Sequence, residues 1–460
     1  MQRDYIGFWR STQLAYGDTV YLRVGVVDIY GFMHPADIRE AVVEKASSFI
    51  RYQRHMDVLS QLHGKSVLIA EGAVWQRQRR MLQPSFNLKR FDAYAAQVAE
   101  AAVGVLDVLP VGAPFDFESA MNMLTMDVVL RTMFGSRIGG DTAQIEAAVR
   151  DLSLIAYNEM FTQFSWPDWL PLPSKARKRA AMRLILDLIG SHVTARRAAP
   201  AGDNDLLDTL LSAREEDEGN ENREEGRRGM LSDLQVRDEL MTIFFAGHET
   251  TAAALTWAGW FLASEPEAAA RAYQEVDQVL GGRTPGYADA ARLPYLGKFI
   301  KETMRLFPPA PGVFMRRATE NVRIGQWLVP KGALVSVCSL VPHYDARWFP
   351  DPGRFDPERF EGEAAKQIPR GAYFPFGTGP RVCIGNSFAA MEMTLVLAML
   401  LQRYRLRLAP GQAQPEIHLQ VIVRPAGGLR LVLERRPELA AVAASASPTP
   451  GCPFHSAGPK

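Results

Sequence analysis

The chain has 460 residues, of which 47% are hydrophobic and 22% charged, so it can bury a large core, and its length alone predicts two or three domains. Its 52 basic and 51 acidic side chains leave a formal net charge of +1, which argues against nucleic acid or another polyanion as a partner. The three cysteines show no paired spacing, which favours a reducing compartment. The first residues contain no apolar run suited to a signal peptide or membrane anchor. We therefore expect a cytoplasmic protein.

The N-terminal part is predicted to form a helix, a hairpin and a second helix. Residues 6–17 form the first helix, and two strands meet at Gly25. His34-Pro35 begins the next helix, because proline is tolerated in a first turn. From 49 to 72 the periodicity fades, and we expect a loop. Its apolar residues suit the wall of a ligand pocket and ordinary core equally well: Ile50, Leu59, Leu62, Val67 and Ile69.

The next segment places an aromatic donor and a cation on one helix face. Trp75 and Arg79 are four residues apart, so an indole N–H and a guanidinium point the same way and suit a carboxylate of a bound ligand. Taken alone, the pair is more typical of a surface arginine beside a half-buried tryptophan. Pro84-Ser85-Phe86 ends this helix.

The middle of the chain is mostly amphipathic helix, for example at 121–134, which ends at Gly135. Residues 155–169 are rich in Met, Phe, Tyr and Trp, which suits an apolar lid or, more simply, core packing. Residues 213–229 are a charge run, and we expect a solvated, mobile loop there.

A long helix is predicted from Ser232, where Gln235 completes a capping box, to about Ser264, where Glu265-Pro266 stops it. Such a helix of roughly 30 residues spans about 45 Å, enough to cross a domain. Near its centre, Ala246-Gly247 and the threonine pair that starts at Thr250 are weak helix formers. They favour a local widening in which a threonine hydroxyl bonds the carbonyl four residues back.

The segment Phe376-Gly377-Thr378-Gly379-Pro380-Arg381-Val382-Cys383-Ile384-Gly385 presents one cysteine on a glycine-rich turn before an apolar helix. The glycines let the backbone turn tightly and approach a flat ligand. The helix N-terminus, the Arg381 cation and a metal would each favour the thiolate of Cys383. A lone cysteine is more often a buried structural residue, so the fixed offsets of its neighbours carry the inference of a metal ligand.

This segment resembles the haem-binding loop of the cytochrome P450 family at five positions, namely Phe376, Gly379, Arg381, Cys383 and Gly385. The likeness extends from about residue 15 to 434. It implies one mainly α, triangular-prism-shaped domain with a minor β-rich lobe over residues 1–436, followed by a disordered tail at 437–460. The length-based count of two or three domains is therefore too high. The chain differs from many members in lacking a proline-rich lead-in.

The resemblance implies haem b as the cofactor, with Cys383 as the axial ligand of its iron. The residues that would contact haem around this ligand are Trp75, Arg79 and Arg381 at the propionates, Arg316 also at a propionate, and Phe376, Gly379 and Ala246.

On the other side of the haem, the resemblance aligns Ala246, Gly247, Glu249 and Thr250 with the family's oxygen-activation segment. Oxygen chemistry needs protons delivered to the distal side. Thr250 would hold a distal water there, and Glu249 would relay protons from solvent.

Three further residues match the scaffold of the family. Glu302 and Arg305 share a helix face, which by itself is a weak signal because exposed pairs are common. The resemblance implies that both form a buried network with Arg359. His343 is more easily read as a structural residue, or one near a propionate, than as an iron ligand.

The function implied is a monooxygenase that inserts oxygen from O2 into an apolar small molecule, by hydroxylation or epoxidation. Its electrons would come from NAD(P)H through a separate ferredoxin or flavodoxin and its reductase, because no flavin or iron–sulfur module fits the remaining chain. A basic patch for this partner is expected from Lys89, Arg77, Arg80, Lys298 and Lys301. A peroxygenase, an isomerase and a haem-based sensor remain alternatives, and the substrate stays open.

Overall fold

The computed structural model describes residues 4–135, 142–162, 166–199, 205–213, 231–419 and 421–437. Most of the charge run at 213–229 and the predicted C-terminal tail lie outside these residues.

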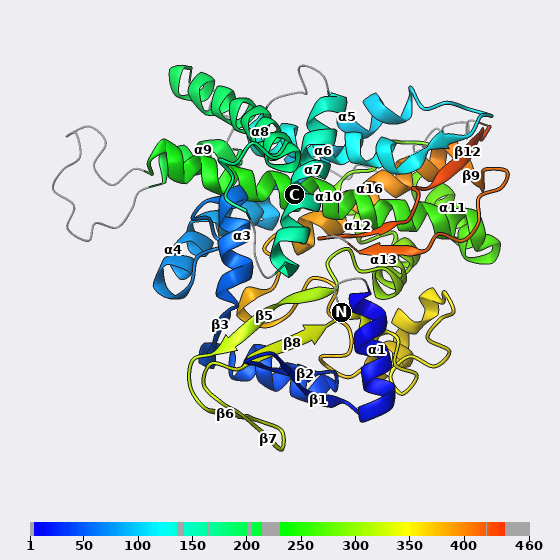
Figure 1. Cartoon of the computed structure of the whole chain (residues 1–460). Coiled ribbons are helices and arrows are strands. Elements are labelled where there is room, and N and C mark those ends of the chain that lie inside the picture. The colour runs from blue at the N-terminus through cyan, green and yellow to red at the C-terminus, as the bar shows by residue number, and fades with distance from the viewer. Residues whose placement is uncertain are drawn as a thin grey trace, which may run out of the picture.

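One long helix, α10 (Asp233–Ser264), runs through the middle of the molecule (Figure 1). The predicted capping box is present, since the Ser232 side chain bonds the Gln235 amide and Gln235 bonds back to the Ser232 amide. Pro266 begins the next helix at once, so α10 ends where the sequence indicated.

The other helices form most of the fold, as the sequence predicted. They are α1 (Tyr5–Tyr16), α2 (Pro35–Arg39), α3 (Gln53–His63), α4 (Gly72–Leu82), α5 (Phe91–Leu106), α6 (Phe117–Phe134), α7 (Thr142–Phe161), α8 (Pro173–Ala198), α9 (Leu206–Ser212), α11 (Pro266–Leu280), α12 (Tyr287–Ala290), α13 (Pro294–Leu306), α14 (Leu340–His343), α15 (Gly362–Gln367) and α16 (Asn386–Arg403).

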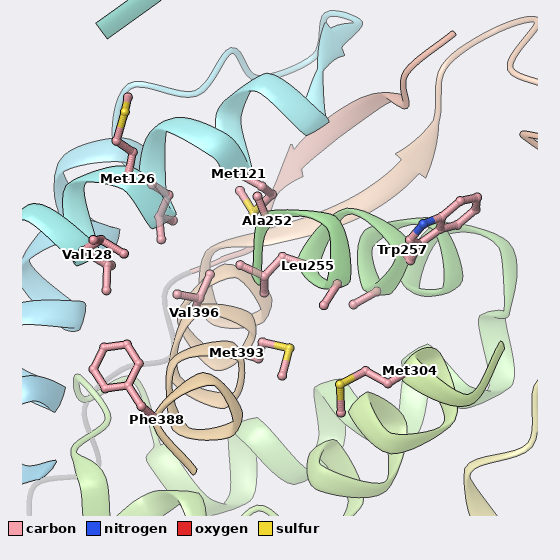
Figure 2. Packing of buried hydrophobic residues seen from close by; sticks show 14 of the residues in the cluster. Met121, Met126, Val128, Ala252, Leu255, Trp257, Met304, Phe388, Met393 and Val396 are labelled. Carbon is pink, nitrogen blue, oxygen red and sulfur yellow. The ribbon is translucent and has the colours of Figure 1, made fainter. Parts of the chain in front are cut away.

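The main hydrophobic core lies where α6, α10 and α16 meet. Figure 2 shows Met121 of α6, Leu255 of α10 and Val396 of α16 among the side chains that fill this space. Each of these side chains is fully buried. On the next turns of α10, the Trp257 ring stacks on Phe307 with centroids 3.7 Å apart. Burial on this scale holds α16, which follows the cysteine loop, firmly against α10.

A five-stranded sheet forms the β-rich lobe, at the bottom of Figure 1 beside α1. Its order is β1 (Thr19–Val24), β2 (Val27–Phe32), β8 (Leu334–Cys338), β5 (Gly312–Ala318) and β3 (Phe49–Arg51). The pairs are antiparallel except β2 with β8, where Ile29 faces Leu334. A second hydrophobic cluster, which includes Phe32 and Val335, lies on this lobe. The predicted fold class, mainly α with a minor β-rich lobe, is confirmed.

Three smaller sheets complete the fold. β6 (Val322–Ile324) pairs with β7 (Trp327–Val329), β4 (Phe115–Asp116) and β9 (Tyr404–Leu408) flank β12 (Arg430–Arg435), and β10 (Ile417–Leu419) pairs with β11 (Val423–Pro425). The strands on either side of Pro425–Gly428 do not pair with each other, because β11 pairs with β10, and β12 pairs with β4 and β9.

The region from 49 to 72 is more regular than the sequence predicted. β3 and α3 occupy its first half, so the expected loop is wrong for these residues. Leu59 and Leu62 are buried in the main core. The helix from Pro35 continues beyond α2 as a π-helical turn, Glu40–Glu44, in which the Lys45 amide bonds the Glu40 carbonyl at 2.9 Å.

Candidate active site

The cysteine loop is shaped by two glycines. Gly377 and Gly379 have φ of 73° and 75°, a region that side chains other than glycine rarely adopt. At Gly379 a Cβ atom would lie 2.2 Å from the carbonyl oxygen of Val42 in the π-helical turn, so only glycine fits. The Cys383 amide donates to the Phe376 carbonyl at 3.0 Å and closes the loop. Gly385 has φ of −93°, so its role is not the backbone freedom that the sequence suggested.

The sulfur of Cys383 is open although protein surrounds it. Cys383 is exposed, yet the surrounding protein raises the pKa of its thiol by burial. The Gly385 amide and the Arg79 cation act in the other direction and favour the thiolate. The sequence assigned this cationic effect to Arg381, but the nearby cation is Arg79. Burial prevails in the protein alone, so a bound metal ion would be needed to hold the thiolate.

Two arginines bond one carboxylate beside this loop, and a third arginine neighbours them. Arg51 donates from Nε to Glu71 Oε1 at 2.8 Å, and Arg381 donates to the other oxygen of Glu71. Arg51 and Arg316 are direct partners across the β3–β5 ladder, where like charges repel. We call Arg51, Arg316, Arg381 and Glu71 the arginine cluster. It holds three cations and one anion, a surplus of two positive charges.

The positive charge of this cluster is buried, and not every N–H group that carries it has a hydrogen-bond partner. Arg316 is 6% exposed, and its Nε atom has no hydrogen-bond partner. The pKa of Arg316 falls to about 10 and that of Arg381 to about 9, chiefly because burial disfavours their charge and also because Arg51 repels both. A buried cation without a partner is costly, so the cluster is suited to bind anionic groups.

Trp75 and Arg79 on α4 adjoin this cluster. The Arg381 guanidinium lies over the Trp75 ring, 4.0 Å from its centroid, and the Arg79 guanidinium lies 5.9 Å from it. Two cations thus lie close to the indole ring. The structure therefore brings together four residues that the sequence placed at one ligand: Trp75, Arg79, Arg316 and Arg381.

The centre of α10 carries a narrow open strip. Between residues 238 and 262 every side chain is buried except Ala246, Gly247 and Thr250, which are exposed or half-buried. Ala246 and Thr250 are four apart and therefore share one face. The Thr250 hydroxyl donates to the Ala246 carbonyl at 2.6 Å, as expected, and the helix continues without interruption. At Gly247 a Cβ would approach Val129 of α6 to 2.9 Å, so a small residue is needed there.

Glu249 points away from this strip into an ionic network. Its carboxylate accepts hydrogen bonds from the Ser153 hydroxyl at 2.7 Å and from the Arg424 guanidinium at 2.5 Å. Arg424 also contacts Glu118 at 2.7 Å. Burial raises the pKa of Glu249, and the Arg424 cation opposes that shift. The carboxylate is therefore buried and paired, and it does not share the exposed face of Thr250.

Glu302, Arg305 and Arg359 are in contact behind the cysteine loop. Arg305 donates to both oxygens of Glu302 at 2.7 and 2.8 Å, and Arg359 donates from Nε at 3.3 Å. Glu302 and Arg305 are fully buried. Glu302 also accepts the Asp356 amide at 2.9 Å, which fastens the segment that leads toward Cys383.

His343 is held by backbone groups on both sides. Its Nε2 accepts the Phe374 amide at 3.1 Å, which leaves Nδ1–H to donate to the Arg305 carbonyl at 3.1 Å. The ring is fully buried, and burial lowers its pKa to about 3. It is a structural neutral histidine, the first of the roles that the sequence indicated.

Comparison with known proteins agrees with this arrangement. The family model described as Cytochrome P450 matches residues 7–433. The chain belongs to the cytochrome P450 family. It is 34% identical to cyclooctatin synthase of Streptomyces melanosporofaciens, over 92% of this chain and 90% of the relative. It is also 34% identical to cyclooctat-9-en-7-ol 5-monooxygenase of the same organism, over 86% and 84%, and 30% identical to pentalenene oxygenase of Streptomyces avermitilis, over 95% and 94%.

This membership makes the chain a P450 oxidoreductase and implies haem with a cysteine thiolate ligand. The residues present fit that group. A haem b carries two propionates, and the arginine cluster has a surplus of two positive charges and an orphaned Nε on Arg316. On the described part of this P450, no helix is both long and apolar enough to cross a membrane.

Arg51, Glu71, Ser153 and Arg424 were missed by the sequence reasoning. Arg51 stands in the short apolar run Phe49-Ile50-Arg51-Tyr52, and a charge there is a signal for a buried partner. The other three are unremarkable in sequence, because their partners lie far along the chain. Within the expected basic patch, Lys298 is neutralised by Glu358 and Glu361.

Proposed function

We propose that this P450 is a haem-thiolate monooxygenase that inserts one oxygen atom of O2 into an apolar small molecule, by hydroxylation or epoxidation. The observation that carries the proposal is the buried surplus of two positive charges beside the open sulfur of Cys383. The surplus matches the charge of the two propionates of haem b, and the Cys383 sulfur would bind its iron.

The chain's own residues would hold the cofactor in two ways. The Cys383 sulfur would bind the iron, and the Gly385 amide and the Arg79 cation stabilise its negative charge. Arg316 and Arg381 would bind the propionates, with Trp75 as a further N–H donor beside them. Haem bound through a thiolate supplies the oxygen chemistry of the family.

The strip on α10 would form the distal side. Thr250 would place its hydroxyl toward a distal water, because it lies on the open face with Ala246. We propose that Glu249 passes protons toward it from the network with Ser153 and Arg424. Burial raises the pKa of Glu249, which favours the protonated form that can donate and so supports that role.

The proposed substrate class is a cyclic hydrocarbon or its alcohol. The relatives are named for cyclooctatin, cyclooctat-9-en-7-ol and pentalenene, and they match over most of both chains. Apolar side chains border the open strip, for example Phe245, which is 6% exposed. Such a wall binds hydrocarbon through burial and discriminates little between close analogues.

Electrons would come from NAD(P)H through a separate ferredoxin or flavodoxin and its reductase. Arg77, Arg80, Lys89 and Lys301 are exposed and remain candidates for its docking surface. Lys298 is excluded from this role by its two acidic partners. Charge reversal at Arg80 and Lys301 should slow turnover at low salt, and unchanged turnover with an unchanged salt dependence would contradict the patch.

The deciding experiment is a carbon monoxide difference spectrum of the reduced, haem-loaded protein. We expect a thiolate-type Soret shift in the natural protein and none in Cys383→Ala, and a shift that survives this substitution would overturn the assignment. With substrate and competent redox proteins, Thr250→Ala should lower the yield of product per electron consumed. Full coupling in that variant would favour a peroxygenase or isomerase.

A further inference from the structure

Glu71 is the one anion of the arginine cluster, and its carboxylate joins two of the three cations. Its Oε1 atom accepts hydrogen bonds from the Arg51 amide at 3.1 Å and from Arg51 Nε at 2.8 Å. The other oxygen, Oε2, accepts a hydrogen bond from the Arg381 guanidinium. Both oxygens are therefore used by groups of β3 and of the cysteine loop, which lie 20 and 310 positions away in the sequence.

The Glu71 side chain serves the arginines and not the helix that follows it. Glu71 is the N-cap residue of α4, a position where a side-chain acceptor commonly bonds an amide of the first turn. Glu71 makes no such bond. The next residue, Gly72, has φ of 55°, a conformation that glycine adopts without strain. α4 therefore begins without a side-chain cap, and the carboxylate is left to the arginines.

The backbone beside Glu71 is held by the same two arginines. The Ala70 carbonyl accepts hydrogen bonds from Arg51 Nη2 at 2.6 Å and from Arg381 Nη1 at 3.0 Å. Arg51 also donates to the Leu68 carbonyl. Since α4 starts directly after this segment, Glu71 and its neighbours fasten the start of α4 to the cysteine loop.

Glu71 acts on the charge of all three arginines. Burial lowers the pKa of Arg51, Arg316 and Arg381, and Glu71 opposes that shift at each of them. The Glu71 side chain is 33% exposed, whereas those of Arg51 and Arg381 are 8% and 17% exposed. One carboxylate, which is itself easier to hydrate, thus helps to keep three buried cations charged.

We propose that Glu71 is a positioning residue for haem, which keeps the arginines charged and in place before the cofactor binds and lowers the reduction potential of the bound haem. This inference rests on the proposed function, because it needs haem propionates at the cluster. The propionates and Glu71 would then share the same arginines. One-electron reduction of the iron adds one negative charge to the site, and a nearby carboxylate opposes that charge. Removing the charge of Glu71 should therefore favour the reduced state.

Potentiometric titration of the full-length, haem-loaded protein tests the proposal, without substrate and with dithionite and mediator dyes. Glu71→Gln removes the charge and keeps the shape. We expect its midpoint potential to be more positive than that of the natural protein, which corresponds to an increase of about threefold or more in the equilibrium constant for reduction. Arg51→Gln removes a cation and should shift the potential in the opposite direction. Glu71→Asp keeps the charge and should restore most of the natural potential.

Haem release to a competing apoprotein separates this role from a merely structural one. Glu71→Gln leaves the Arg381 guanidinium freer to bind a propionate, so haem should leave this variant no faster than the natural protein. A carboxylate that only fastened α4 would, when removed, loosen the site and release haem faster without moving the potential. The matched control is Glu363→Gln, which removes the charge of a side chain that is 80% exposed and should leave both measurements unchanged.

Three outcomes would overturn the proposal. The first is a potential of Glu71→Gln that equals the natural one or is more negative. The second is a shift of the same size in Glu363→Gln. The third is faster haem release from Glu71→Gln with an unchanged potential. The carbon monoxide difference spectrum is recorded first, because a natural protein without a thiolate-type shift would overturn the proposed function and this inference with it, whereas a normal shift followed by any of the three outcomes overturns this inference alone.

Discussion

Glu302→Gln is the substitution whose cost the structure defines best. Glu302 is fully buried and receives two hydrogen bonds from Arg305, one from Arg359 and one from the Asp356 amide. Glutamine keeps the shape but removes the charge, so the buried Arg305 cation loses its counterion. Its remaining partners are carbonyl groups, including that of His343 at 2.7 Å.

Breaking a buried ion pair in this way costs about 3–5 kcal/mol. At roughly 1.36 kcal/mol per factor of ten, the ratio of folded to unfolded protein falls by about two to almost four powers of ten. Denaturant unfolding, followed by circular dichroism and by loss of the haem Soret band, measures the change. Glu302→Gln combined with Arg305→Met should cost less than the sum of the two single substitutions, because the unpaired cation is removed.

Glu363→Gln is the matched control, because Glu363 and Lys366 form the same kind of pair with side chains that are 80% and 72% exposed. Its cost should be below about 0.5 kcal/mol. The reasoning is refuted if Glu302→Gln shifts the unfolding free energy no more than this control does. Additive effects of the two buried substitutions would also contradict it.

Three further predictions follow from single contacts. Gly379→Ala should abolish stable haem incorporation, because the new Cβ atom would collide with the Val42 carbonyl. Gly411→Ala is the control: Gly411 has φ of 79° in open space, so this substitution should lower the free energy of unfolding by only about 1–2 kcal/mol. The haem-to-protein ratio after purification distinguishes the two variants. Arg316→Gln should release haem to a competing apoprotein roughly tenfold faster than the natural protein does, because the Nε atom without a partner is removed. Arg317→Gln, on the same strand, should release haem at the natural rate. Equal rates for the two variants would contradict the role of Arg316. Burial raises the pKa of Glu239 from its ordinary value of 4.5 to about 8. Between these two pH values the folded state keeps a proton that the unfolded state releases. The free energy of unfolding should therefore fall as the pH rises through this range. Glu239→Gln should flatten that slope between pH 4.5 and 8. Denaturant midpoints of this variant that change with pH as steeply as those of the natural protein would contradict this.

The local parts of the fold were predictable from the sequence. The capping box at Ser232 and the proline at 266 define the ends of α10, because caps and proline act through backbone groups a few residues away. The five positions around Cys383 identified the family for a similar reason, since a tight glycine turn before a helix leaves its mark within ten residues.

The sequence was less informative where long-range packing decides the structure. Residues 49–63 show little periodicity, yet they form β3 and α3 because strand pairing with β5 and burial against the core stabilise them. The position of β12 likewise depends on β4, a strand distant in sequence, in addition to β9.

The electrostatics of the site depended on tertiary structure most of all. Arg51 and Arg316 are separated by 265 positions and become neighbours only through the register of β3 with β5. Glu249 is adjacent in sequence to Thr250, but the helix turns it toward Ser153 and Arg424. The sequence by itself determined which residue types the chemistry needs, through motifs that short-range geometry imposes. Only the folded chain decided how their charges balance, because Coulomb interactions and desolvation depend on which distant groups are buried together.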